Sequence, residues 1–251
     1  MNQIQHLAAV MDGNRRWAQQ RGLANFLGHR NGIQPIREVI EVCLNHKIKY
    51  LSLYALSTEN LKRGTEEVNF LIDLIIEGLN KHLPEFLANG VKVKFLGDRS
   101  YLPTDKLSAE KIAQVNQICD QVESATAHLG QLNLNFLFCY GAQQEILAAT
   151  KKIAARVASG ELKLANITAQ ELENCLWTAG IPAPDLIIRP GNRPCMSNFL
   201  LYQGAYSELY YTETLWPAMR QADFELALVE FGQRRRSWGL TAPACQAPTV
   251  T

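Results

Sequence analysis

Runs of apolar residues alternate with amphipathic segments along the chain, and the polar breaks between them are short. Strand-length apolar or alternating runs predict five strands, over Leu7 to Met11, Tyr50 to Leu56, Val91 to Phe95, Leu132 to Phe138 and Asp185 to Ile188. Helical spacing predicts a helix beginning near Arg15 and others over Asn31 to His46, Thr65 to Leu79, Ile112 to Val122, Gln144 to Ala158, Ala169 to Thr178 and Asp223 to about Arg236. This alternation predicts an α/β fold, a single domain with a mostly parallel central sheet flanked by helices.

Polar clusters follow three of the predicted strands. They cover Asp12 to Asn14, Ser57 to Arg63, and Arg189 to Ser197. The loops after parallel strands share the carboxyl edge of the sheet, where ligands of α/β proteins bind. We therefore expect the three clusters to converge on one site.

The first cluster suggests an anion site. A strand that passes through a glycine turn into a helix presents unpaired N–H groups and a positive dipole end. Arg15 and Arg16 lie in that first turn, where the dipole disfavours cations unless an anion binds. A divalent metal would explain Asp12 beside an anion, because it bridges carboxylate and phosphate oxygens. The alternative is a plain Asp-Gly-Asn turn with solvated arginines.

Composition restricts the function classes. The chain has 251 residues, 47% hydrophobic and 20% charged, and a net charge of +1. A near-neutral protein gives no ground for nucleic-acid binding or for strong attraction to a membrane, so an anion site must be local. We expect at most peripheral membrane contact, since no apolar run approaches the ~20 residues that span a bilayer.

Cysteine usage and the chain's beginning indicate a cytoplasmic protein. The six cysteines are Cys43, Cys119, Cys139, Cys175, Cys195 and Cys245. Their spacing matches no metal motif, and most fall in apolar segments, so we expect free thiols in a reducing compartment. No signal peptide is recognisable at the beginning of the chain.

Several ordered motifs resemble those of the cis-prenyltransferases, the family of undecaprenyl diphosphate synthase. The first is Met11 to Ala18 with Gly28-His29, and the second is Ser57-Thr58-Glu59-Asn60 with Arg63. The third comprises Pro184 to Arg189, Ser197 to Gln203, Ala205 to Tyr210 and Leu215 to Pro217. The resemblance spans nearly the whole chain and implies a catalytic domain over residues 1–240. The small, proline-containing segment over 241–251 predicts a disordered tail.

The resemblance implies a Mg²⁺-dependent condensation of an allylic prenyl diphosphate with isopentenyl diphosphate, usually by a homodimer. Asp12 would place Mg²⁺ on the allylic diphosphate. The implied binding residues around it are Gly13, Asn14, Arg15, Arg16, Trp17 and His29. Without the motif, a histidine after glycine is more often a partly buried side chain.

The second and third motifs would serve the acceptor and the proton transfer. Asn60 and Ser57 would handle the proton lost on condensation. Without the motif, the simpler interpretation of this segment is a helix cap. The other implied binding residues are Thr58, Glu59, Arg63, Arg189, Arg193 and Ser197. Glu208 would join the metal site from the partner subunit or near the interface; the alternative is an ordinary surface charge.

A helix that is apolar around much of its circumference follows the second cluster, over Val68 to Leu79. It is the candidate wall of a tunnel for the prenyl chain, opposite Ala55 on the preceding strand. Plain core packing is the alternative. Each buried methylene contributes about 0.8 kcal/mol, so a few isoprene units would bind strongly.

The acceptor motif departs from the family pattern, Arg-x-Gly-x-x-x-Arg-x-Ser. Cys195 stands where the second arginine is expected, and Arg193 lies two residues earlier. Pro194 replaces a histidine that often binds metal in bacterial members. The departure leaves open an irregular coupling of two allylic diphosphates, as in lavandulyl-type synthases. A non-catalytic partner subunit is a further alternative, but such relatives lose the aspartate that is present here as Asp12.

Overall fold

The computed structural model describes residues 4–234. Its centre is a six-stranded sheet in the order β3-β4-β2-β1-β5-β6, in which every neighbouring pair is parallel. The strands are β1 (His6–Val10), β2 (Tyr50–Ser57), β3 (Val91–Leu96), β4 (Leu132–Tyr140), β5 (Leu186–Pro190) and β6 (Glu208–Thr212). The predicted fold class and the five predicted strands are confirmed.

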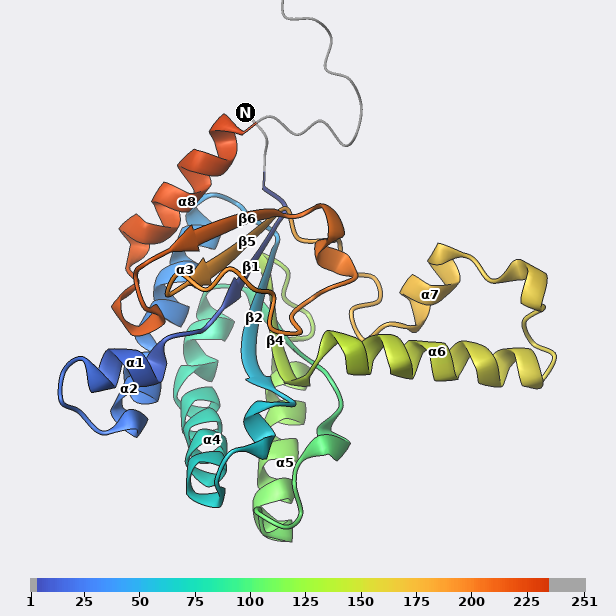
Figure 1. Ribbon diagram of the computed structural model, residues 1–251, viewed down its shortest axis with the longest axis horizontal. Helices are drawn as coiled ribbons and strands as arrows, with labels where there is room; N and C mark the ends of the chain where they lie inside the picture. Colours follow the sequence, from blue (N-terminus) through green and yellow to red (C-terminus); the bar gives the residue numbers. More distant parts are fainter. Residues whose placement is uncertain (1–3, 235–251) are drawn as a thin grey trace, which may run out of the picture.

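The α-helices are α1 (Asn14–Gln19), α2 (Asn25–Asn31), α3 (Gln34–Asn45), α4 (Thr65–Ala88), α5 (Ala109–Thr126), α6 (Ala142–Ala158), α7 (Ala169–Cys175) and α8 (Gln221–Gln233). Alternating strand positions face α3, α4, α5 and α8, and this side holds most of the core. The opposite side is covered mainly by the segment around Phe199 and Leu200. Helices α6 and α7 form an arm to one side of the sheet (Figure 1).

Three elements differ from the sequence prediction: the short helix α2, which no predicted segment covers, the strand β6 and the helix α4. The edge strand β6 lies in the aromatic-rich block over residues 199–216, where the pattern indicates no strand; it is short and mostly half-exposed, so it lacks an apolar run. Helix α4 continues nine residues past Leu79 although it contains Pro84. Packing against the core overrides the local cost of that proline.

Part of the predicted C-terminal helix and the predicted tail over 241–251 lie outside the described residues. Among the helices that are described, none has the length and apolar character needed to cross a membrane. The five described cysteines are unpaired; all but Cys195 are buried.

A buried histidine links three central strands. His6 Nδ1 donates to the Pro182 carbonyl oxygen at 2.6 Å, and Nε2 accepts from Ser52 Oγ at 2.8 Å. Asn135 Nδ2 donates to the same hydroxyl at 3.1 Å. Burial lowers the pKa of His6 to about 4, so the imidazole is neutral at neutral pH.

We expect the free energy of unfolding to fall on acidification, by about 2 kcal/mol from His6 alone between pH 7 and pH 5. The folded-state pKa of about 4 lies below the ordinary value of 6.5, so the unfolded chain binds more protons in this window and stability rises with pH. Urea titrations of the wild type and of His6→Asn across this range measure the effect. Equal pH slopes for the two proteins would contradict it.

Candidate active site

Residues from three loops meet at the carboxyl edge of the sheet, as the sequence predicts. Strand β1 lies between β2 and β5, so the loops that follow these strands are neighbours. Asp12 follows β1, and Arg189 is a buried residue of β5. Arg189 Nη2 lies 3.2 Å from Asp12 Oδ2 and donates to Ser197 Oγ at 2.9 Å. Residues 177 positions apart thereby form one polar cluster.

The turn after β1 depends on a glycine. Gly13 has a φ of 101°, and a side chain there would collide with Leu215. Its N–H donates to Asp12 Oδ1 at 2.6 Å, which fixes the carboxylate at the start of α1. Arg16, in the first turn of that helix, donates from Nη1 to the Gly191 carbonyl oxygen at 2.9 Å and connects this turn to the loop after β5.

Several buried polar atoms of the cluster have no hydrogen-bond partner among residues 4–234. They are Nε and Nη1 of Arg189, Nη2 of Arg16 and Oδ1 of Asn14. Burying a cationic donor without an acceptor is costly, and an anion with several oxygens would supply acceptors for the three arginine atoms, although not for the Asn14 oxygen, which is itself an acceptor. The arrangement therefore favours a binding site for a phosphate-type anion over the alternative of a plain turn with solvated arginines.

The donor set fits a metal ion that arrives with its ligand. Within the described part of the chain, no group of three or more His, Cys, Asp or Glu side chains could hold an ion. Asp12 nevertheless offers a partly exposed carboxylate beside the unpaired arginine donors. Mg²⁺ is commonly bound through one or two carboxylates, with substrate phosphates and water supplying the other oxygens. The residues present fit that mode.

A histidine and an ion pair lie at the mouth of the same site. His29 Nε2 is 3.6 Å from Glu67 Oε1, which also pairs with Arg63 Nη1 at 2.9 Å. Burial, followed by the nearby positive charge of Arg63, lowers the pKa of His29 to about 4. His29 is therefore neutral at neutral pH, and the positive charge at the mouth comes from arginines.

The cluster after β2 is held by reciprocal capping bonds. Ser57 N–H donates to Asn60 Oδ1 at 3.1 Å, and Asn60 N–H donates to Ser57 Oγ at 3.1 Å. These bonds close the turn that leads into a short 3-10 helix, Asn60–Lys62, whose N-cap residue Glu59 makes no side-chain cap bond. Asn60 also lines the cavity described below. Thr58 is buried, and Glu59 Oε1 accepts from Asn198 Nδ2 at 3.0 Å.

Asn198 connects the loops, a role that the sequence motifs did not indicate. Its Nδ2 also donates to Gln144 Oε1 at 2.9 Å, and its Oδ1 accepts the Gln143 N–H at 2.8 Å. Asn198 and Ser197 both have positive φ values, 62° and 50°. An Asn-containing polar pair in a loop was the available signal, because asparagine tolerates this conformation better than most residues.

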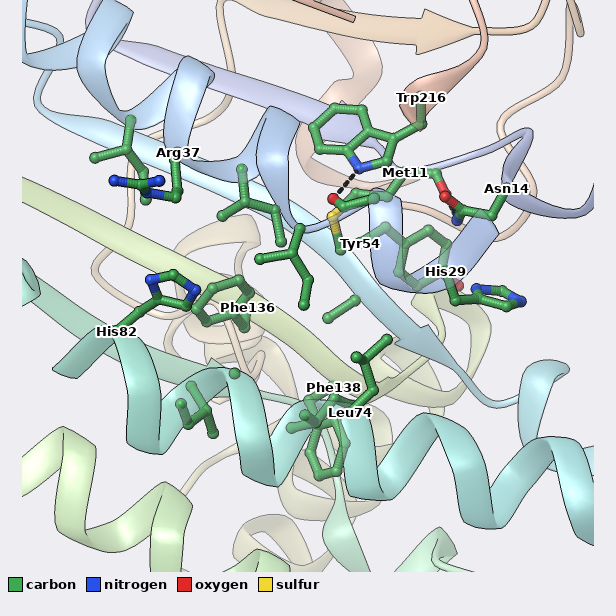
Figure 2. A pocket seen from close by; sticks show the side chains of 18 of the residues that line it. Met11, Asn14, His29, Arg37, Tyr54, Leu74, His82, Phe136, Phe138 and Trp216 are labelled. Atoms are coloured by element: carbon green, nitrogen blue, oxygen red, sulfur yellow. Dashed lines mark hydrogen bonds between the residues drawn. The ribbon is translucent and has the colours of Figure 1, made fainter. Parts of the chain in front are cut away.

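A long cavity of about 800 Å³ opens from the polar cluster and runs between α3 and α4 over the sheet. Figure 2 shows Asn14 and His29 at one end, with Leu74, Phe136 and Phe138 deeper inside. Its apolar lining comes from Ile33, from α3 (Ile36, Ile40, Leu44), from α4 (Leu71, Leu74, Ile75, Leu79, Phe86) and from the strands (Ala55, Val91, Phe95, Phe136, Phe138). The helix and Ala55 predicted as a tunnel wall do line this cavity.

The structure places most of the predicted site residues at the cavity mouth or directly behind it. Lining the cavity are Asp12, Gly13, Asn14, Arg15, Arg16, His29, Asn60, Arg63 and Arg193. Trp17 is placed elsewhere: it stacks under the Arg21 guanidinium at 4.4 Å and does not line the cavity. Cys195 Sγ lies 3.9 Å from Arg189 Nη2, so a thiol stands beside the buried arginine.

Glu208 does not join Asp12 within one chain. It is the first residue of β6 and pairs with Leu186, whereas Arg189 pairs with Tyr211. At ~3.3 Å per residue, Glu208 lies about 10 Å back along the strand from the level of Arg189. Its carboxylate accepts from Arg234 Nη1 at 3.0 Å. A contribution to the metal site from a second copy of the chain stays a prediction.

A cationic pocket at the carboxyl edge of a parallel sheet, opening into a long apolar cavity, suits an amphiphile with an anionic head. Comparison with known proteins specifies the class further. The family described as "Putative undecaprenyl diphosphate synthase" matches residues 10–239. The chain belongs to this family, the cis-prenyltransferases, and is a prenyltransferase.

Named relatives and solved structures agree with this assignment. A ditrans,polycis-undecaprenyl-diphosphate synthase of Legionella pneumophila, described as (2E,6E)-farnesyl-diphosphate specific, is 40% identical over 94% of this chain and 95% of that protein. An isoprenyl transferase of Heliobacterium mobile is 39% identical over 93% and 86%.

Two crystal structures share the fold. Lavandulyl diphosphate synthase from Lavandula x intermedia, in complex with dimethylallyl diphosphate, superposes with a TM-score of 0.88 at 29% identity, covering 94% of this chain and 98% of that one. A "probable undecaprenyl diphosphate synthase" from Campylobacter jejuni gives a TM-score of 0.76 at 34% identity, covering 95% and 100%.

Proposed function

We propose that this prenyltransferase condenses an allylic prenyl diphosphate with isopentenyl diphosphate, in the presence of Mg²⁺, to give a Z-prenyl diphosphate. The continuity between the Asp12–Arg189 cluster and the apolar cavity carries the proposal, because it provides for both parts of such a substrate. The Legionella relative, named for farnesyl diphosphate, supports the choice of donor.

In the proposed reaction the allylic C–O bond breaks, the allylic carbon bonds to the terminal alkene carbon of the acceptor, and a proton leaves the acceptor. Mg²⁺, held by Asp12, would supply charge neutralisation on the departing diphosphate. Arg16 and the helix start would bind the same diphosphate, whose charge grows as the bond breaks. Arg189, Arg193 and Ser197 would hold the acceptor diphosphate, while Asn60 and Ser57 would orient the proton transfer.

The test is an assay of the purified protein with farnesyl diphosphate, labelled isopentenyl diphosphate and Mg²⁺. We expect extractable products that differ by five-carbon units, and loss of turnover on addition of EDTA. Mass spectrometry gives the lengths. Failure to incorporate label with five-, ten- or fifteen-carbon allylic diphosphates would exclude the proposal.

A second candidate is the irregular coupling of two allylic diphosphates. It is favoured by Cys195 beside Arg189, where the family usually has another arginine, and by the similarity to lavandulyl diphosphate synthase. Incubation with dimethylallyl diphosphate alone separates the two reactions. A branched ten-carbon diphosphate would support the irregular coupling, whereas turnover that depends on isopentenyl diphosphate would exclude it.

Homodimerisation and a cytoplasmic location are also proposed, on the resemblance to the family. A second copy would be the source of Glu208 for the metal site, since one chain keeps Glu208 away from Asp12.

A further inference from the structure

The cavity has a charged end opposite the diphosphate site. The lining there includes Arg37 and Glu41 of α3 and His82, Glu85 and Asn89 of α4. Figure 2 shows His82 beside Phe136, and Arg37 above them on α3, at the end opposite Asn14 and His29. Arg37, Glu41 and Asn89 are exposed, so the cavity reaches solvent between the two helices here.

Three of these side chains form one interaction, which we call the distal clasp: Arg37, His82 and Glu85. Arg37 Nε pairs with Glu85 Oε2 at 3.1 Å, so the pair joins the two helices that wall the cavity. His82 Nδ1 lies 3.2 Å from the same oxygen. The His82 side chain is 11% exposed, against 51% for Arg37 and 43% for Glu85. The clasp therefore extends from the surface into the cavity.

An apolar chain growing toward this end meets a change of environment. Along the apolar walls each added methylene favours binding by about fourfold. At the clasp, further advance would displace water from a charged pair without giving it a new partner, which is unfavourable. The gain in binding affinity with each added methylene should therefore end at the clasp.

We propose that the distal clasp sets the length at which the prenyl chain stops growing. The inference rests on the proposed function and adds a specificity determinant remote from the reacting atoms. A charged pair between two helices, and not the bulk of one side chain, is the limiting feature.

The first test is product length. Arg37→Leu/Glu85→Leu is expected to shift the main product upward by at least one five-carbon unit, with little change in the rate of the first condensation. Arg37→Glu/Glu85→Arg, which keeps a pair of opposite sign, is expected to restore the wild-type length. Both positions are about half-exposed, so the variants should fold.

The matched control is the pair between Arg30 of α2 and Glu77 of α4, at 3.3 Å and similarly exposed. Neither residue lines the cavity. Arg30→Leu/Glu77→Leu is expected to leave product length unchanged. An equal shift in the control, or no shift in the clasp variant, would overturn the inference.

A binding measurement separates this inference from the proposed activity. Saturated n-alkyl phosphates of increasing length serve as inert probes, and calorimetry gives Kd for each. For the wild type, affinity should rise with each methylene and then level off, whereas in Arg37→Leu/Glu85→Leu the plateau should move to longer chains. Identical plateaus would overturn the clasp even if the enzyme is active, and a shifted plateau would support it even if condensation fails.

Discussion

Replacing Asp12 with alanine is expected to lower kcat about a thousandfold while leaving the fold intact. Removal of one preorganised group that stabilises developing charge costs about 10²–10³ in kcat, and loss of the metal's position adds to this. Asp12 also lies 3.2 Å from the buried Arg189 and 3.8 Å from Arg16. Its loss would leave these two positive side chains without the carboxylate that offsets their charge. Steady-state turnover with saturating substrates measures the effect.

Asp12→Asn distinguishes charge from shape. The amide keeps one acceptor oxygen, for either the Gly13 N–H or Arg189, and presents an N–H donor to the other; it is also a weak ligand for Mg²⁺. We expect it to be nearly as inactive as the alanine variant, with an unchanged circular dichroism spectrum. Glu66→Ala, at an exposed position of α4, is the control with wild-type turnover. Substantial turnover by Asp12→Asn would show that the carboxylate does not hold a metal.

The meeting of three loops could be predicted from sequence because it follows from topology. Polar residues after parallel strands share an edge, and Asp12, Asn60 and Arg189 follow or end three adjacent strands. The direct Asp12–Arg189 contact could not be predicted in this way. It depends on strand register and on which side of β5 the arginine faces.

Features set by long-range geometry were missed. The distal clasp comes from helices α3 and α4, and its residues share no sequence pattern. They line one cavity because of how the two helices are spaced in the fold, which the sequence does not reveal. Glu208 is the opposite case, a residue with a sequence motif that the fold keeps away from the site in the same chain. Its motif implies a metal ligand, but its register in β6 holds it away from Asp12 in the same chain.

Replacing Arg189 with methionine is expected to raise the KM for isopentenyl diphosphate by about a hundred- to ten-thousandfold, more than it lowers kcat. Its Nε and Nη1 lack partners among the described residues, so a bound diphosphate would gain two charge-assisted hydrogen bonds from it. Each is worth about 1.5–3 kcal/mol, and every 1.4 kcal/mol is a tenfold change in affinity.

Two further variants show whether the effect comes from the geometry of the Arg189 donors and whether it is specific to the site. Arg189→Lys keeps the charge but not the planar fork of donors, so it should recover only part of the affinity. Arg156→Met, on α6, removes an arginine paired with Glu161 and Glu171 and does not line the cavity; it should leave both KM values unchanged. If Arg189→Met instead raised the KM for the allylic substrate alone, the buried arginine would belong to the donor diphosphate. The acceptor would then be held by Arg193 and Ser197 without it.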